Sequence, residues 1–270
     1  MYSLHLLCTA EEVDGISLRL WEAGTLGIQE IEGSDAIKLI AMFEREDLPS
    51  VLAEQFREFS CTWEQEDDTD WVRATEESWP ARTIGQKLFL APPWCSEPTP
   101  NGRLRIIHRP GMASGTGEHP CTQLALQALE QIVVPGCMVG DIGAGSAILA
   151  IAARRLGAQF AVGIDTDDAS IQVAKGNAAL NSLLIPLAVG SAECLESGSL
   201  DIAVANINAT VLLALSDDLQ RLVKPNGTLI LSGFQDIELT TMRDVFSSQT
   251  VLQQDGWCAL IATCSAAASS

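Results

Sequence analysis

The sequence predicts an α/β protein in which a doubly wound, mostly parallel sheet follows a smaller ferredoxin-like α+β domain. From residue 123 onward, short apolar strands alternate with helical segments of about 10 to 15 residues. Such strand-helix-strand crossovers make the strands parallel and cover both faces of the sheet. The preceding part of the chain instead shows the order β-α-β-β-α-β. We therefore expect one domain at 1–66, a linker at 67–81 and a second domain at 82–270.

The first domain is expected to contain four strands and two helices. The first helix has apolar side chains at helical spacing and ends at Gly24, while Pro49 lies at the start of the second. The strands are expected at 2–8, 27–32, 36–43 and 61–66, and the helices at 11–23 and 48–59. This order is that of a ferredoxin-like, two-layer unit.

The acidic stretch EDDTDW and the following EESW have no strong apolar period, so they are expected to connect the two domains. Residues 86–90 and 103–108 then flank a turn-rich segment, which predicts a hairpin or an added strand pair. The elements of the main sheet are expected in the order strand 138–143, helix 149–156, strand 161–165, helix 169–181, strand 200–207, helix 212–222, strand 228–234, helix 236–246 and strand 257–262, after a helix at 124–132.

Composition and charge restrict the classes of partner. The 270 residues are 47% hydrophobic and 19% charged, as in a folded globular protein. Sixteen basic residues against 35 acidic ones give a net charge of −19. Binding phosphates requires clustered lysine and arginine, so we expect no direct contact with nucleic acid. A basic protein suits this charge better.

Cysteine usage and the ends of the chain indicate the compartment. The eight cysteines include no C-x-x-C pair and no histidine at zinc-finger spacing, so we expect reduced, mostly buried thiols and no metal site. The start MYSLHLLCTAEEVDG lacks the pattern of a secretory signal, and no apolar run approaches the ~20 residues of a membrane span. These features predict a cytoplasmic protein with no membrane partner.

The most informative stretch is VGDIGAGSA at 139–147, where a strand leads into a helix through two glycines. Gly143 permits a tight turn, and Gly145 lets the backbone approach a ligand without an intervening Cβ. A dinucleotide fingerprint would need glycine or alanine where Ile148 stands, and no G-K-[ST] follows for a phosphate loop. The loop therefore predicts a ligand other than a dinucleotide or a triphosphate.

Two acids accompany this loop. Asp141 ends the first strand, where its carboxylate would repel a pyrophosphate and attract an ammonium or sulfonium group. Asp165 ends the next strand, about 20 residues after the glycines, where an acid can accept both ribose hydroxyls of an adenosine. Together they favour S-adenosylmethionine over NAD. The alternative is that the glycines only permit close packing and that Asp165 caps the following helix.

Asn206 lies at the end of the third strand, at the edge where doubly wound sheets bind ligands. Its amide could accept a hydrogen bond from an incoming amine and orient the nitrogen lone pair, which makes it the candidate catalytic residue. The alternative is an asparagine that only forms a turn.

Residues 110–122, PGMASGTGEHPCT, resemble the P-G-x-A-F-G-T-G-x-H-x-x-T segment of the methyltransferase family that modifies protein eleven of the large ribosomal subunit. The resemblance continues through DIGAGSAILAIAARRLGA, VGIDTDDASIQVAKGNAALN, VANI and LVKPNGTLILSGF, and it covers nearly the whole chain from Asp70 onward. The first domain is similar in position and size to the substrate-recognition domain of that family.

The resemblance implies a class I, Rossmann-like methyltransferase that uses S-adenosylmethionine and transfers methyl groups to lysine ε-amines and an N-terminal α-amine of a ribosomal protein. It implies cofactor contacts at positions matching the motifs and a loop that closes over the methionine moiety. With the two acids and the second glycine above, the cofactor set comprises Gly115, Thr116, Gly117, Thr122, Asp141, Gly143, Gly145, Asp165 and Asn206. His119 is expected to hydrogen-bond within its own loop.

The chain departs from the pattern of that family at five positions. The family usually has tryptophan at Thr75, an acid at Arg109, an aromatic residue at Ser114, a third glycine at Ala147 and leucine at Asn208. Two alternatives therefore stay open: a methyltransferase that acts on a small molecule or on another protein, and a cofactor-binding relative that lacks catalysis.

Overall fold

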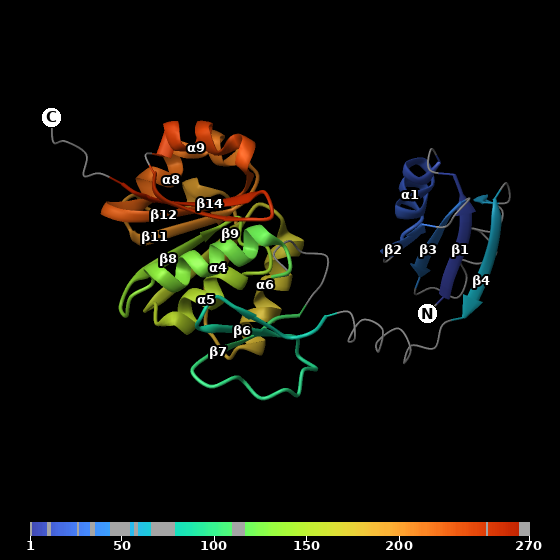
Figure 1. Ribbon diagram of the computed structural model, residues 1–270, viewed down its shortest axis with the longest axis horizontal. Helices are drawn as coiled ribbons and strands as arrows, with labels where there is room; N and C mark the ends of the chain where they lie inside the picture. The colour runs from blue at the N-terminus through green and yellow to red at the C-terminus, as the bar shows by residue number, and fades with distance from the viewer. Residues whose placement is uncertain are drawn as a thin grey trace. The chain divides into compact units, whose positions relative to one another are not determined.

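The computed structural model describes residues 2–9, 12–25, 27–32, 36–43, 55–56, 59–65, 79–109, 117–246 and 248–264. The chain divides into two compact units, Met1–Ser78 and Trp79–Ser270 (Figure 1). The expected linker at 67–81 lies outside the described residues apart from its last three, which belong to neither a helix nor a strand.

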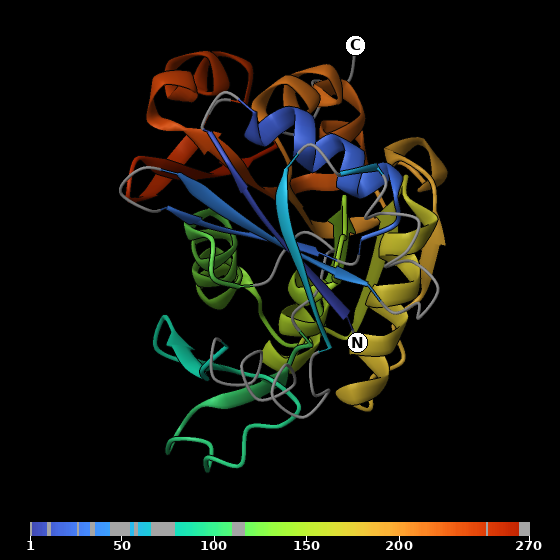
Figure 2. The same cartoon turned by 90° about the vertical axis from the view of Figure 1, so that its right-hand side faces the viewer.

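The smaller unit has a four-stranded antiparallel sheet in the order β2-β3-β1-β4. Its described elements are β1 (Tyr2–Cys8), α1 (Val13–Glu22), β2 (Gly27–Glu32), β3 (Ile37–Phe43) and β4 (Ser60–Gln65). Helix α1 lies against one face of the sheet (Figures 1 and 2), where Leu4 and Leu6 alternate along β1 and share a core with Ile16 and Leu20. The strand order is that of a ferredoxin-like unit, while most of the expected helix at 48–59 lies outside the described residues.

The larger unit is built on a seven-stranded sheet in the order β10-β9-β8-β11-β12-β14-β13. The first five strands are parallel, and β14 and β13 are antiparallel to their neighbours. The strands are β8 (Met138–Ile142), β9 (Phe160–Asp165), β10 (Leu187–Val189), β11 (Leu200–Asn206), β12 (Val223–Gln235), β13 (Ser248–Gln254) and β14 (Trp257–Thr263). The expected doubly wound, mostly parallel sheet is therefore present, with β10 and β13 as additional edge strands.

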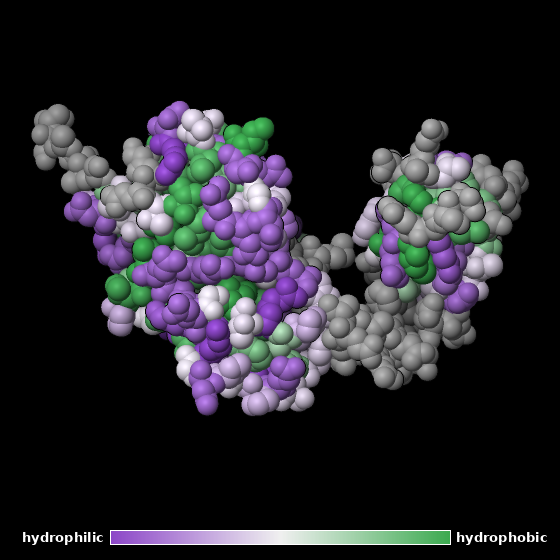
Figure 3. Space-filling view, viewed as in Figure 1, coloured by the Kyte–Doolittle hydropathy of each residue, from purple (hydrophilic) through white to green (hydrophobic). Residues whose placement is uncertain are grey.

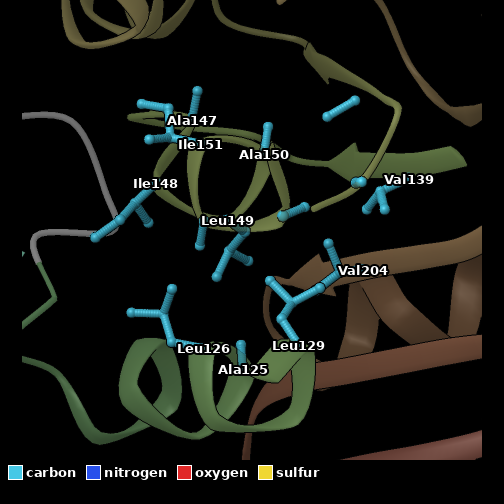
Figure 4. Close-up of a cluster of buried hydrophobic side chains, with 14 of the residues drawn as sticks. Ala125, Leu126, Leu129, Val139, Ala147, Ile148, Leu149, Ala150, Ile151 and Val204 are labelled. Atoms are coloured by element: carbon cyan, nitrogen blue, oxygen red, sulfur yellow. The ribbon is translucent and has the colours of Figure 1, made fainter. Parts of the chain in front are cut away.

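Helices cover both faces of this sheet, as expected. One face carries α4 (Pro120–Ile132), α5 (Ile148–Leu156) and α6 (Asp168–Leu180), and Figure 4 shows side chains of α4 and α5 directed toward each other. The opposite face carries α7 (Ala209–Ala214), α8 (Ser216–Leu222) and α9 (Leu239–Phe246). The single helix expected at 212–222 is thus two helices, and the one expected at 236–246 begins with a 3₁₀ turn at Asp236–Glu238.

A three-stranded sheet precedes α4. It consists of β5 (Arg82–Ile84), β6 (Leu88–Ala91) and β7 (Leu104–Ile107). The expected strands at 86–90 and 103–108 correspond to β6 and β7, which pair in parallel, while the hairpin joins β6 to the unexpected β5. Ile84, Leu88 and Ile106 pack into the same core as α4 and α5, so this small sheet belongs to the larger unit.

All eight cysteines are free, and four of them are buried. Among the helices in the described part of the chain, none has both the length and the apolar character that crossing a membrane requires.

Candidate functional site

The site predicted from the sequence lies where the strand order of the large sheet reverses. The chain passes from β8 to β9 and β10 on one side and then returns to β11 and β12 on the other. Doubly wound proteins bind ligands at the carboxyl ends of the strands at such a reversal. Asp141, Asp165 and Asn206 lie at these ends of β8, β9 and β11.

The glycine loop after β8 is fixed by backbone contacts. Gly143 and Ala144 both donate N–H to the carbonyl oxygen of Ile164 at 2.9 Å. Gly143 has φ of 72° and Gly145 has φ of 51°, which L side chains rarely adopt. A Cβ on Gly143 would also lie 2.5 Å from Cγ2 of Ile207. The turn therefore requires glycine at 143.

Ala147 ends this loop in the left-handed region, with φ of 60°, at the position where the resembled family usually has a third glycine. A non-glycine residue in this region is disfavoured by about 1–2 kcal/mol. Ala147 is fully buried, so its methyl group contributes to the core. It is the N-cap of α5, and its methyl side chain cannot accept a hydrogen bond from the first turn.

Asp141 supplies the missing cap. Its Oδ2 accepts the N–H of Ala150 in the first turn of α5 at 2.9 Å. The side chain is fully buried, and its Oδ1 has no hydrogen-bond partner among the described residues. Burial, with a smaller contribution from the charge of Asp165, raises the pKa of Asp141 to about 8. Below this pKa the carboxyl is protonated, and a cationic ligand group that reached Oδ1 would favour the ionised form and satisfy the oxygen.

Asp165 is half-buried, and both of its oxygens accept backbone N–H groups. Oδ2 accepts from Gly145 at 2.8 Å, and Oδ1 accepts from Asp167 at 3.0 Å. The cap of α6 is Asp167, whose carboxylate accepts from Ala169 and Ser170. The alternative of Asp165 as a helix cap is therefore wrong. Each carboxylate oxygen has two acceptor sites, so capacity for ligand hydroxyls remains.

Asn206 and Thr122, which are 84 positions apart, are joined by a hydrogen bond. The Nδ2 of Asn206 donates to Oγ1 of Thr122 at 3.1 Å, and Thr122 is buried in the first turn of α4. With its nitrogen engaged in this way, Asn206 presents a carbonyl oxygen that accepts no hydrogen bond within the described part of the chain. This side-chain amide oxygen at the edge of the sheet can accept a hydrogen bond from an amine.

The loop before α4 is only partly described. Gly115 and Thr116 of the expected cofactor set lie outside the described residues, whereas Gly117 is buried with φ of 81°. A Cβ on Gly117 would collide with the side chain of Leu90. Glu118 forms an ion pair with Arg82 of β5. The loop is therefore attached to the three-stranded sheet as well as to α4.

His119 was expected to hydrogen-bond within its own loop, and its partner is instead the first turn of α4. Its Nδ1 accepts the N–H of Cys121 at 3.3 Å, which makes it the N-cap of α4 ahead of Pro120. The ring also lies edge-on to Trp257 at 4.6 Å between centroids.

The sequence patterns did not single out Asn177 and Asn181, which are buried in α6. Asn177 bonds to the backbone of Ser146 in the glycine loop and of Arg109 after β7. Asn181 bonds to the backbone of Ile107. The sequence offers one signal for them, which is two asparagines four residues apart in an alanine-rich helix. Their partners are distant in the sequence and become neighbours only in the fold.

One departure from the family pattern has a local explanation. Asn208 is the N-cap of α7 and accepts the N–H of Val211 at 3.0 Å. Arg109 bonds to Asn177 through its backbone N–H, which leaves its side chain without a structural explanation. Thr75 and Ser114 lie outside the described residues.

Comparison with known proteins gives a match over most of the chain. Residues 8–265 match the family described as ribosomal protein L11 methyltransferase. The ribosomal protein L11 methyltransferase of Vibrio vulnificus (strain CMCP6) is 38% identical over 205 residues, covering 74% of this chain and 69% of that protein. The protein of the same name from Vibrio parahaemolyticus is 34% identical over 232 residues, covering 82% of this chain and 78% of its own.

Solved structures share the fold. A ribosomal protein L11 methylase from Lactobacillus delbrueckii subsp. bulgaricus superposes with a TM-score of 0.64 at 29% identity, covering 70% of this chain and 99% of that one. A 16S rRNA methyltransferase from T. thermophilus, in complex with AdoMet and guanosine, gives a TM-score of 0.55 at 20% identity over 97% of this chain and 64% of that one. The expected doubly wound fold is confirmed.

Proposed function

Because the chain belongs to the ribosomal protein L11 methyltransferase family, we propose that it methylates amines of ribosomal protein L11 with S-adenosylmethionine as donor. The chain is a methyltransferase with a class I, Rossmann-like fold. The observation that carries the proposal is the pair of Asn206 and Thr122 at the reversal of the strand order, which leaves an amide oxygen directed to no protein donor in the described residues.

The residues at this edge fit the proposed cofactor. The orphaned, buried Oδ1 of Asp141 suits a cationic ligand group, and the half-buried Asp165 retains acceptor sites for ribose hydroxyls. The backbone of Gly143 and Gly145 lies between these acids in the chain. We propose that these residues, with Gly115, Thr116, Gly117, Thr122 and Asn206, hold S-adenosylmethionine.

When bound, S-adenosylmethionine supplies an activated methyl group on a sulfonium. The contribution of the protein is to orient and desolvate the amine. A lysine amine must be neutral to attack, although its reference pKa is ~10.4, and an apolar environment favours its neutral form. Asn206 accepts an N–H of the amine and directs the nitrogen lone pair, while the released proton passes to water. No dedicated general base is needed.

The substrate side of the proposal rests on charge and domain organisation. A net charge of −19 favours a basic protein partner and disfavours direct contact with nucleic acid. Hydrophilic side chains cover much of the visible face of the larger unit (Figure 3). We assign substrate recognition to the N-terminal domain at 1–66, lysine ε-amines and the N-terminal α-amine as acceptors, and the cytoplasm as the site of action.

The test is incubation of the purified chain with ribosomal protein L11 and S-adenosylmethionine labelled in the methyl group. We expect labelled L11, and mass spectrometry should locate the methyl groups on amines. The same incubation is repeated with a cell lysate in place of L11. Label found only in a small molecule or in another protein would favour a methyltransferase with a different substrate. Calorimetric binding of the cofactor without transfer to any amine would favour a non-catalytic relative.

A further inference from the structure

Two buried asparagines of α6 bind backbone groups of two other segments of the larger unit. Asn177 and Asn181 are 1% and 2% exposed, and they lie one helical turn apart on the same face. We propose that Asn177 is a positioning residue for the cofactor: its amide holds the glycine loop in its binding conformation by tying Ser146 to the main chain at Arg109. This inference rests on the proposed function.

The amide of Asn181 shows how such a side chain substitutes for a neighbouring strand. Its Oδ1 accepts the N–H of Ile107 at 2.9 Å, and its Nδ2 donates to the carbonyl of the same residue at 2.6 Å. Ile107 ends β7, which pairs with β6 on its other side. The side chain therefore satisfies backbone groups that an edge strand leaves unpaired.

Asn177 uses its two polar atoms on two different segments. Its Oδ1 accepts the N–H of Arg109 at 3.0 Å, and its Nδ2 donates to the carbonyl of Ser146 at 3.1 Å. The opposite amide orientation would place donor against donor and acceptor against acceptor, so the two bonds fix the assignment. Only a group that both donates and accepts can bridge these partners.

The bond to Ser146 falls at the strained part of the glycine loop. The next residue, Ala147, is in the left-handed region at φ of 60°. Such a conformation persists only where its surroundings determine it. Asn177 restrains the carbonyl immediately before this residue, whereas the amide of Asn181 bonds to Ile107 and to its own helix in the described part of the chain. Variants at the two positions can therefore distinguish an effect on the glycine loop from an effect on the packing of α6.

Substitution by aspartate preserves size and tests the donor alone. Burial raises the pKa of a carboxyl at this position, so the comparison is made at alkaline pH. There the ionised carboxylate of Asn177→Asp still accepts from Arg109 but opposes the carbonyl oxygen of Ser146. In Asn181→Asp the loss falls on the carbonyls of Ile107 and Asn177, away from the glycine loop. The donor that is removed makes one hydrogen bond at Asn177 and two at Asn181, so Asn181→Asp should lower thermal stability at least as much as Asn177→Asp. Only Asn177→Asp should change the loop.

The experiment compares wild type, Asn177→Asp and Asn181→Asp in the full chain. Hydrogen exchange without ligand should be faster at 143–147 in Asn177→Asp only. Calorimetry with S-adenosylhomocysteine should give at least tenfold weaker binding for Asn177→Asp and less than threefold for Asn181→Asp. With labelled S-adenosylmethionine and L11, KM for the cofactor should rise in Asn177→Asp while kcat changes less than twofold.

Lowering the pH should rescue cofactor binding by Asn177→Asp. A protonated carboxyl both donates and accepts, so lowering the pH should return the affinity of Asn177→Asp toward that of wild type at the same pH. If Asn177→Asp does not fold, Asn177→Ser, whose hydroxyl cannot span both partners, should show the same loop exchange and weaker binding without the rescue. Equal exchange and affinity in the variants at the two positions would overturn the inference. Failure of wild type to bind S-adenosylhomocysteine would overturn the proposed function instead. The two failures are distinguishable because the hydrogen-exchange measurement on the glycine loop needs no ligand.

Discussion

Asp141 and Asp165 are identical side chains at the ends of adjacent strands, yet they occupy different environments. Asp141 is fully buried and gives one oxygen to the first turn of α5, whereas Asp165 is half-buried and holds the glycine loop. The sequence predicted both positions because strand ends meet at one edge of a parallel sheet. It did not predict that Asp141 would also cap a helix, since that depends on how α5 packs.

Burial of Asp141 predicts a pH dependence of stability. Its folded pKa of about 8 exceeds the unfolded value of about 3.9, so in this window the folded chain binds a proton that the unfolded chain has lost. The free energy of unfolding should therefore fall as pH rises, by up to about 1.4 kcal/mol per unit. Asp141→Asn should flatten this slope in urea denaturation between pH 6.5 and 8.

His108 limits the measurement of the Asp141 effect to the range between pH 6.5 and 8. Burial lowers its pKa to about 4, so stability is lost as pH falls from about 6.5 toward 4, which opposes the contribution of Asp141. His108→Gln should leave the slope above pH 6.5 unchanged. An identical slope in wild type and Asp141→Asn would contradict the assignment.

The hydrogen bond between Asn206 and Thr122 predicts a matched pair of variants. Thr122→Val preserves shape but removes the acceptor for Nδ2 of Asn206, so the amide oxygen is no longer held toward the amine. A net loss of about 1 kcal/mol predicts a roughly fivefold lower kcat for L11 methylation. Thr122→Ser keeps the hydroxyl and should stay within about twofold of wild type. Equal rates in the two variants would show that the hydroxyl does not act through Asn206.

At the scale of elements, apolar patterning predicted the central strands and missed the edges. β13, SQTVLQQ, is a mostly polar edge strand, and β10 has only three residues after Pro186. Neither offers the apolar run that buried strands need. The expected helix at 212–222 divides at Leu215, whose φ of −94° and ψ of 11° lie outside the helical range. Thr122 entered the expected cofactor set only through the family resemblance, and its hydrogen bond with Asn206 was not predicted.

The junction of β11 and β12 predicts a strongly destabilising substitution. Gly233 has φ of 98°, and a Cβ there would collide with the backbone of Ile207, the residue after Asn206. Gly233→Ala should therefore destabilise the chain by about 2–4 kcal/mol in denaturant titration. Gly176→Ala is the control, because α6 has open space at that position and alanine favours a helix by about 1 kcal/mol. Similar midpoints for the two variants would refute the collision.

At the scale of the molecule, each compact unit has a hydrophobic core of its own. A fragment comprising 79–270 should therefore fold and bind S-adenosylhomocysteine with the affinity of the full chain. If the N-terminal domain recognises the substrate, kcat/KM for L11 should fall at least tenfold in the fragment. Calorimetry and methyl transfer measure the two quantities separately. Undiminished methylation of L11 would place recognition in the catalytic unit.

The tie between Asn177 and position 109 runs through an N–H group that every residue except proline possesses. The side chain of Arg109 has no part in it. The residue at this position can thus change, even in the sign of its charge, and leave the course of the polypeptide unaltered. A substitution here can alter the charge of an exposed surface position while the backbone beneath it stays constant.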